Sequence, residues 1–464
     1  MSVGGATIGV EPRVGREDAV KFRVDRDVLS DAVSWVARAL PTRPVVPVLS
    51  GLLVQADDDE LTLSCFDYEV SARVRVPAEV GEPGIALVPG RLLADITRSL
   101  PPADVEVTST AGMVMLTSGN AEFALVSLPL QEYPKVPELP AVAGTVDGGA
   151  LAAAAAQVVP AASRDDTLPM LTGVCLDFDR GSLTVAATDR YRLAVRTLSW
   201  QPVDPDFHAS ALVPARTLAD VARTMGPGKP VTIAFGERPE DGNRPADGMI
   251  SFEGGGRRLT ARLIGTQYIK YESRFPSSFE ACAELSAGPF IEAVRRVSLV
   301  ADRATPVQLG FRRDVVVIEA QSDGRARAVE SVPVRFTGAN QVISFNPHYL
   351  LDGLAAAAIN GQVRPASAAS DGPDAPVPGS GRIKLEFTSP AKPALISWID
   401  GDATAGARVN DLAPPDFVNS ARNAATAAES GPAAPGAPSS AALRSASIAA
   451  FRYLVVPLRV PVAG

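Results

Sequence analysis

Hydrophobic positions along the chain follow two spacings, and the same succession of spacings occurs three times. In each of the segments 27–40, 149–162 and 287–300, apolar residues recur every three or four positions, which predicts an amphipathic helix. In the first of these, the predicted buried stripe is Leu29, Ala32, Val33 and Val36. Segments such as 70–76 instead alternate apolar and polar residues, as strands of antiparallel sheets do. The pattern therefore predicts three units of the α+β class, each with two helices and several strands.

Sequence blocks recur with these spacings. Pro47-Val-Leu-Ser-Gly51 returns as Pro169-Met-Leu-Thr-Gly173, and Leu61-Thr-Leu-Ser-Cys-Phe-Asp67 returns as Leu183-Thr-Val-Ala-Ala-Thr-Asp189, both 122 positions later (47 to 169, 67 to 189). The segment 86–98 matches 211–223, and 344–354 is a weaker third copy. Pro89, Pro214 and Pro347 align in these copies and predict helix starts, with Leu92, Leu93 and Ile96 on one face of the helix after Pro89. Two blocks with one offset indicate an internal duplication.

The repeats divide the chain into an N-terminal extension (1–20) and three domains (21–141, 142–284 and 285–464). The third domain contains two stretches rich in Ala, Ser, Pro and Gly, at about 364–381 and 402–449, and we expect no packed core in them. The segments 383–387, 392–398 and 453–460, which flank these stretches, read as strands.

Composition narrows the functional classes. The 464 residues are 46% hydrophobic and carry a net charge of −8, which does not exclude a local basic surface. We find no apolar run of the roughly 18 residues that cross a bilayer and no signal-peptide pattern, so we expect a cytoplasmic protein without a membrane partner. Three dispersed cysteines and two histidines predict no metal site, cofactor or His-based catalysis.

An enzyme is the main alternative class, and the motifs do not favour it. The chain has no phosphate-binding loop of the Gly-x-x-x-x-Gly-Lys type and no Gly-x-Ser-x-Gly elbow. The Gly254-Gly-Gly256 and Asp57-Asp-Asp-Glu60 segments lie between strand patterns, where we expect hairpin turns and no phosphate or metal site. A non-catalytic protein is therefore predicted.

The repeated blocks, together with the end Val455-Val-Pro-Leu-Arg459 and the segments 43–51, 165–173 and 187–195, resemble the bacterial DNA sliding clamp family. This family is the beta subunit of the DNA polymerase III holoenzyme, and segments 67–71 and 190–192 are similar to its actinobacterial members. The resemblance implies three clamp domains, each with two helices packed on two antiparallel sheets, and a head-to-tail ring dimer around duplex DNA. The implied function is that of a processivity factor at the nucleoid, which tethers polymerase to DNA.

A ring that slides must contact phosphates without reading bases. On the helices implied to face DNA, or at their ends, lie Arg38, Arg91, Arg98, Arg164, Arg216, Arg223, Arg295 and Arg296; ordinary solvated arginine is the alternative for each. The resemblance implies a homodimer interface between Phe123 and Leu125 of one chain and Leu299 and Val300 of its partner, or else all four belong to domain cores.

The resemblance further implies a pocket between domains two and three. It takes short peptides from the replicative polymerase, the clamp loader and repair proteins. The matching positions are Leu171, Thr188, Arg190, Arg192, Leu193, Asn346, Tyr349, Leu454, Val456, Pro457, Leu458 and Arg459; Leu193 and Leu454 have core positions as their alternative.

One wall of this pocket departs from the family pattern of aromatic-Pro-x-aromatic. The first repeat keeps Tyr133-Pro-Lys-Val136, whereas the second reads Tyr268-Ile269-Lys-Tyr271, followed by Glu272, Ser273 and Arg274. Either the change is neutral drift, or the chain is a specialised second clamp whose pocket rejects a clamp-directed antibiotic. A protein-interaction scaffold that does not tether to DNA is the alternative from another class.

Overall fold

The computed structural model describes residues 20–110, 112–136, 140–225, 228–235, 248–301, 305–322, 325–359, 381–399 and 451–458. These residues form three copies of one α+β unit. The first unit contains β1 (Val20–Val24), α1 (Arg26–Ala37), β2 (Gly51–Asp57), β3 (Glu60–Phe66), β4 (Val70–Pro77), β5 (Glu79–Glu82), β6 (Gly84–Pro89), α2 (Gly90–Ser99), β7 (Val105–Thr110), β8 (Met113–Ser118) and β9 (Ala121–Val126).

The second and third units repeat this order. The second contains β10 (Ala141–Asp147), α3 (Gly148–Val158), α4 (Pro169–Thr172), β11 (Gly173–Asp179), β12 (Ser182–Thr188), β13 (Arg192–Pro202), β14 (His208–Pro214), α5 (Ala215–Met225), β15 (Pro230–Phe235), β16 (Met249–Gly254) and β17 (Arg257–Arg262). The third contains β18 (Ala281–Ser286), α6 (Ala287–Val297), β19 (Val307–Phe311), β20 (Val315–Ser322), β21 (Ala326–Pro333), β22 (Arg335–Thr337), β23 (Gln341–Phe345), α7 (Pro347–Ile359), β24 (Arg382–Phe387), β25 (Ala394–Ile399) and β26 (Phe451–Val455).

The predicted domain boundaries fall near the starts of units. Residue 141 is the first residue of β10, and the boundary after residue 284 falls inside β18, which pairs with β24 of the third unit along its whole length. The extension before Val20, the first low-complexity stretch up to residue 380 and the second stretch lie outside the described residues.

Two antiparallel sheets build each unit. In the first unit, one sheet has the order β5-β1-β7-β8-β9 and the other joins β4, β3, β2 and β6. Tight turns close the hairpins as predicted: Asp58 and Asp59 have φ angles of 44° and 60° between β2 and β3, and Gly255 and Gly256 have 63° and 77° between β16 and β17. Positive φ at two successive positions is typical of the two-residue hairpin turn that matches strand twist.

Consecutive units are joined edge to edge by strands in equivalent positions. β4 of the first unit pairs with β17 of the second, and β13 of the second pairs with β26 of the third. Within the described residues, the strands left with one neighbour at the ends of this series are β9, which pairs with β8, and β21, which pairs with β20. The series of paired sheets therefore has two free edges: β9, which is equivalent to β17 and β26, and β21, which is equivalent to β4 and β13.

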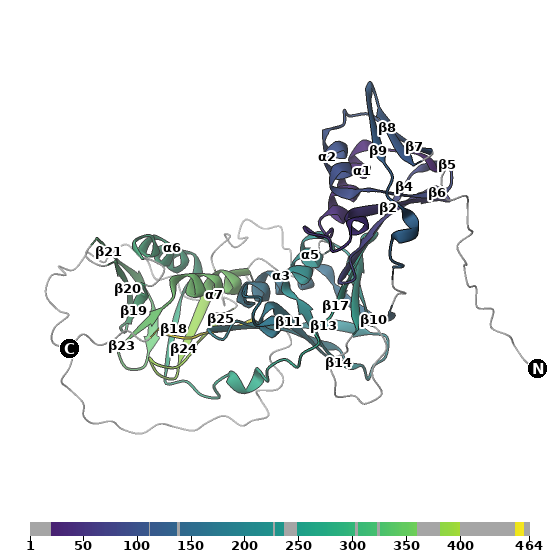
Figure 1. Cartoon of the computed structure of the whole chain (residues 1–464). Helices are drawn as coiled ribbons and strands as arrows, with labels where there is room; N and C mark the ends of the chain where they lie inside the picture. The colour runs from purple at the N-terminus through teal and green to yellow at the C-terminus, as the bar shows by residue number, and fades with distance from the viewer. Residues whose placement is uncertain are drawn as a thin grey trace, which may run out of the picture.

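Helices form a second layer. α1 packs on α2, α3 on α5 and α6 on α7, and α3 also packs on α7 across the junction of the second and third units. The predicted stripe of α1 is confirmed, because Leu29, Ala32, Val33 and Val36 are all buried. Figure 1 shows the units along a bent path, with the helices on its inner side and the sheets on the outer side.

Side-chain caps set where several helices begin. Asp25 accepts hydrogen bonds from the amides of Asp27 and Val28, at 2.9 and 3.0 Å, and Asp147 caps α3 in the same way. The predicted proline starts are right in place but shifted in detail: Pro89 and Pro214 end the preceding strands, and Pro347 alone is the first helical residue. Across the described residues, no helix is both long and apolar enough to cross a bilayer.

Candidate functional site

The strand pair β13–β26 places predicted site residues from two distant parts of the chain side by side. Leu193 lies opposite Leu454, and Arg192 lies opposite Val455. The segment after β26 is then fixed by the backbone: the amide of Val456 donates to the carbonyl of Tyr191 at 2.9 Å, and that of Leu458 donates to the carbonyl of Ser344 at 2.8 Å. The segment from Val456 to Leu458 therefore lies against the junction of the second and third units.

An apolar cluster separate from the main core covers this junction, and we call it the junction cluster. Its buried members come from the second unit, the third unit and the segment between them: Cys175, Ala186, Leu193, Val195, Leu212, Tyr271, Leu395 and Leu454. Partly buried residues pack against it: Met170, Ile264, Tyr268, Ile269, Phe275 and Phe279. Since six large apolar side chains remain partly accessible, the cluster offers apolar surface to a ligand.

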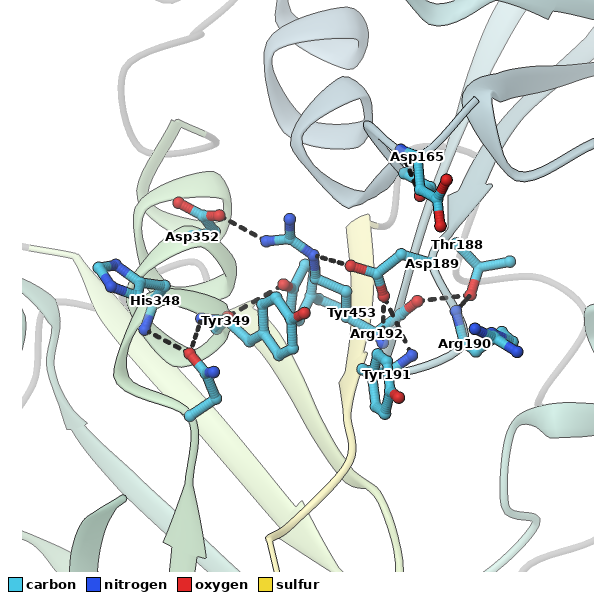
Figure 2. A network of polar contacts seen from close by, with 12 residues as sticks. Asp165, Thr188, Asp189, Arg190, Tyr191, Arg192, His348, Tyr349, Asp352 and Tyr453 are labelled. Atoms are coloured by element: carbon cyan, nitrogen blue, oxygen red, sulfur yellow. Dashed lines mark hydrogen bonds and ion pairs between the residues drawn. The ribbon is translucent and has the colours of Figure 1, made fainter. Parts of the chain in front are cut away.

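A polar network centred on Arg192 borders the cluster. Its guanidinium donates to Asp189 at 2.9 Å and forms a second, short ion pair with Asp352 of α7. It also lies 4.6 Å from the centre of the Tyr349 ring, which stacks on Tyr191. Figure 2 shows Arg192 between the two carboxylates. One arginine thus joins the second and third units through charge and ring contacts.

The network keeps Arg192 charged and oriented. Burial lowers the pKa of its guanidinium, but Tyr453, Asp352 and Asp189 raise it by more, so the pKa lies above its usual value. Asp189 also accepts hydrogen bonds from the amides of Tyr191 and Arg192, both at 3.0 Å, which holds the turn before β13. The guanidinium is therefore a fixed cation with two carboxylate partners.

The segment between the second and third units forms the other side of the cluster. The buried hydroxyl of Tyr271 donates to Asp177 Oδ2 at 2.6 Å, and Ser210 Oγ donates to Asp177 Oδ1 at 2.5 Å. Burial, and then the charge of Asp177, raise the pKa of Tyr271 well above its usual value. On the far side of the segment, Arg452 of β26 lies 4.2 Å from the centre of the Phe275 ring. This segment is anchored to both units.

The predicted pocket residues do not all lie at the junction cluster. Leu193, Ile269 and Leu454 belong to the junction cluster, and Arg192 and Tyr349 to the polar network. Three others lie next to these groups. Asn346 caps α7, and Thr188 Oγ1 donates to the carbonyl of Arg192. Arg190, with φ of 80°, lies in the turn between Thr188 and Arg192. Outside the cluster lie the buried Leu171, the exposed Ser273 and Arg274, and the segment of Val456, Pro457 and Leu458; Arg459 lies outside the described residues.

Sequence reasoning missed several members of the site. Asp352 is 160 positions from Arg192, and Tyr191, Tyr271 and Asp177 were also not singled out as site residues. The spacing of Asp189 and Arg192, three positions apart across a turn, was a signal for one ion pair. The pairing with Asp352 had no comparable signal, because it depends on how α7 packs.

The junction of the first and second units is built alike but carries different chemistry. By the offset of 122, Ser71 corresponds to Leu193, and its cross-strand partner is Thr260 where Leu193 has Leu454. The next outward position pairs Arg73 with Arg258, and burial and the charges of Arg258 and Arg75 lower the pKa of Arg73. At this strand pair, polar and cationic groups therefore replace both leucines and Val195, while the first unit keeps a smaller apolar cluster of Val48, Leu49 and Leu87.

The predicted DNA-facing arginines are all exposed in the described residues. Four of them pair with carboxylates on or near the same helices: Arg98 with Asp95, Arg223 with Asp220, Arg295 with Glu292 and Arg296 with Glu330. Arg91 donates to the carbonyls of Leu40 and Pro41. Arg38 ends α1, Arg164 lies in the loop before α4 and Arg216 lies in the first turn of α5. The inner layer therefore carries cations whose charge is partly compensated.

Two of the predicted interface residues lie on the free edge strand β9, and the other two lie in the turn after α6, which contacts β20 and β21. Leu125 on β9 is buried in its own unit, whereas Phe123 on the same strand is half-buried. Leu299, at the end of α6, has an exposed fraction of 82%, and Val300 is half-buried. Leu125 thus fits its alternative assignment to the domain core, while Leu299 is free to contact a partner.

Comparisons with known proteins match segments in all three units to one protein family. Family models of the DNA polymerase III beta subunit match at residues 20–137 (N-terminal domain), 145–270 (central domain) and 272–364 (C-terminal domain). The chain is 47% identical to the beta sliding clamp of Streptomyces coelicolor over 378 residues, covering 82% of this chain and 94% of that protein. It is 42% identical to the beta sliding clamp homolog GriR of Streptomyces muensis over 335 residues, covering 72% and 88%.

Solved structures give the same picture of the fold. The sliding clamp of Pseudomonas aeruginosa bound to griselimycin superposes with a TM-score of 0.73 at 22% identity, covering 95% of this chain and all of that one. The clamp of Bacillus subtilis has the same TM-score and identity, with 95% and 99% covered.

Proposed function

The chain belongs to the DNA polymerase III beta subunit family, the bacterial sliding clamps, and on that premise we propose which of its residues close the ring, face DNA and bind partners. It is a processivity factor of DNA replication, a clamp that encircles duplex DNA. Such a clamp acts by topology, so we assign no catalytic residue. We propose that it works at the nucleoid, in the cytoplasm.

The proposal of a closed ring rests on a strand pairing that is repeated at both junctions of the chain. Twice in the chain a strand equivalent to β4 pairs with a strand equivalent to β9, as β4 with β17 and β13 with β26. Applied once more, the rule pairs β21 of one chain with β9 of a second copy, and two such contacts close a ring without a free edge. Phe123 and Leu299 then lie at the contact, with Leu125 and Val300 supporting them from behind.

The inner layer of helices supports sequence-independent contact with DNA. Arg38, Arg164 and Arg216 have no carboxylate partner among the described residues, and the paired Arg98 and Arg223 recur at equivalent positions. Weak phosphate contacts of this kind keep the duplex centred and allow sliding.

The decisive experiment is retention on DNA after loading. We expect the dimer to stay on nicked circular duplex and to leave the same duplex once it is linearised. Leu299→Asp should give monomers in sedimentation and no retention, because it places a carboxylate in the proposed contact. Val342→Asp, at an exposed position on β23, is the matched control and should remain a dimer. Equal retention on circular and linear DNA would contradict the proposal.

We also propose that the junction cluster is the docking site for short peptides of the replicative polymerase, the clamp loader and repair proteins. Apolar anchors of the peptide would cover the partly accessible side chains of the cluster, such as Ile269, which pack over the buried Leu193 and Leu454, and the Arg192 network would bind the peptide's polar groups. Titration with a labelled peptide from the clamp-binding segment of the polymerase, against the variant Leu454→Asp, tests this assignment. Equal affinity would exclude the cluster.

A specialised clamp is the second candidate, and Ile269 favours it. The residue packs on the junction cluster where the family pattern has proline, and Glu272, Ser273 and Arg274 are exposed beside it. A wall of changed shape and charge can reject one ligand and keep another. We expect griselimycin to bind this chain more weakly than it binds the variant Ile269→Pro, while the polymerase peptide binds both alike. Parallel changes for both ligands would leave neutral drift as the explanation.

A further inference from the structure

The segment from Tyr268 to Phe275, which we call the wall segment, crosses from the second unit to the third beside the proposed peptide site. Its apolar side chains pack on the junction cluster, and Glu272 to Arg274 form a single exposed turn. The backbone of the segment pairs with no strand in the described residues. Its position therefore depends on side-chain contacts.

The first repeat shows what the same segment has elsewhere in the chain. Tyr133 corresponds to Tyr268, and the next residue there is Pro134, whose ring fixes φ. Tyr133 accepts a hydrogen bond from the amide of Phe66 at 2.7 Å. Val136, with an exposed fraction of 42%, stands where the second repeat has Tyr271, and Gln55 stands where it has Asp177. The first copy thus has the proline and lacks the phenol–carboxylate pair.

The second copy has the reverse combination. Ile269 leaves φ free, but the hydroxyl of Tyr271, whose exposed fraction is 4%, donates to Asp177 Oδ2 at 2.6 Å. The acceptor is itself fixed, because Asp177 lies on β11 and accepts a second hydrogen bond from Ser210 of the neighbouring β14. A buried hydrogen bond to a charged acceptor on a sheet is a strong and directional anchor.

We propose that Tyr271 and Asp177 are positioning residues of the peptide site, and that their hydrogen bond holds the wall segment in its binding conformation where the sequence lacks proline. This inference rests on the peptide site proposed above. Neither residue needs to touch the ligand. Tyr271 acts through its neighbours Tyr268 and Ile269, which pack on the same cluster.

The physical basis is preorganisation. A ligand that binds one conformation of a mobile wall loses apparent affinity in proportion to the fraction of molecules in other conformations. Deleting one hydroxyl leaves the carboxylate of Asp177 with Ser210 and leaves the phenyl ring in the cluster. The wall then keeps its apolar packing on the cluster and the contact between Phe275 and Arg452, but it loses the directional hydrogen bond to β11.

The test is a double-mutant cycle between Tyr271→Phe and Ile269→Pro on the full-length dimer, with a labelled polymerase peptide as the probe. We expect Tyr271→Phe alone to weaken binding roughly tenfold, the scale of one charged hydrogen bond. In the Ile269→Pro background the same change should cost less than about twofold, because proline restricts the wall by itself. Asp177→Asn keeps an acceptor and should lose less than Tyr271→Phe.

Tyr133→Phe is the matched control, since it removes a hydroxyl from the equivalent tyrosine at the other junction. It should leave peptide affinity unchanged. The inference is overturned if Tyr271→Phe binds like the original chain, or loses the same factor with and without proline. If Ile269→Pro does not fold, as judged by thermal melting, the comparison of Tyr271→Phe with Tyr133→Phe decides alone. Failure of the unaltered dimer to bind the peptide would instead refute the peptide site.

Discussion

At the scale of single residues, buried acids that titrate at high pH set a prediction for stability. Burial raises the pKa of the Cys65 thiol to about 12, and burial followed by the charge of Asp177 raises that of the Tyr271 phenol. Both pKa values lie above those of the unfolded chain, so the protonated forms stabilise the fold. That stability is complete below the unfolded values and is lost as pH rises through the folded ones.

We therefore expect the urea midpoint of unfolding to be constant between about pH 7 and 8 and to fall above about pH 9, where the unfolded thiols ionise. Unfolding followed by circular dichroism at fixed ionic strength checks this. In Tyr271→Phe the decline above about pH 10 should be shallower, because one shifted phenol is gone. A midpoint that rises with pH over this range would contradict the assignment.

Residues of the site could be predicted only where the resemblance to clamps supplied their positions. Arg192, Leu193 and Leu454 were expected to lie together, and the pairing of β13 with β26 places them side by side. Asp352 was not predicted as a site residue, because its contact with Arg192 depends on how α7 packs against the second unit. Tyr271 read as part of an aromatic pattern, and nothing local indicated Asp177, nearly a hundred positions earlier, as its acceptor.

At the scale of elements, the spacing of apolar residues was enough to predict the helices, but the helices predicted at 27–40, 149–162 and 287–300 end three or four residues earlier than expected. The spacing also failed at Leu92. Leu93 and Ile96 are buried in α2 as expected, but Leu92 has an exposed fraction of 49%. Adjacent residues on a helix point about 100° apart, so Leu92 and Leu93 cannot both face the sheet. The same helical geometry places residues three positions apart side by side, so Arg98 forms an ion pair with Asp95 and Arg223 forms one with Asp220.

These repeated ion pairs predict how the inner helices meet DNA. Asp95→Asn and Asp220→Asn would release two arginines on each chain. The salt dependence of DNA binding should steepen by about 0.9 for each new phosphate contact. Fluorescence titrations over a series of KCl concentrations measure the slope. Asp57→Asn, at the end of β2, serves as the control and should leave the slope unchanged. An unchanged slope in the double variant would place these helices away from the duplex.

At the scale of the whole molecule, the duplication was readable because two blocks of the first two units share one offset of 122. Other blocks lie at larger offsets and the third copy is weaker, and the comparisons with known clamps agree with three units. The spacing of the repeats predicted three units but could not predict which edges meet. Strand order across a junction depends on long-range pairing, as in β4 with β17, between residues more than 180 positions apart. The resemblance to clamps supplied that information.

The different residues at the two junctions have a consequence for the number of partner proteins that one ring can bind at the same time. At the first junction, Ser71, Thr260 and the Arg73–Arg258 pair stand where the second has leucines, valine and arginine. The first unit has only a smaller apolar cluster of Val48, Leu49 and Leu87 among the described residues, so we expect an apolar peptide to bind more weakly there. If the junction cluster is the peptide site, as we propose, a closed dimer has two strong peptide sites instead of four. We therefore expect one ring to bind at most two peptide-bearing partner proteins at once.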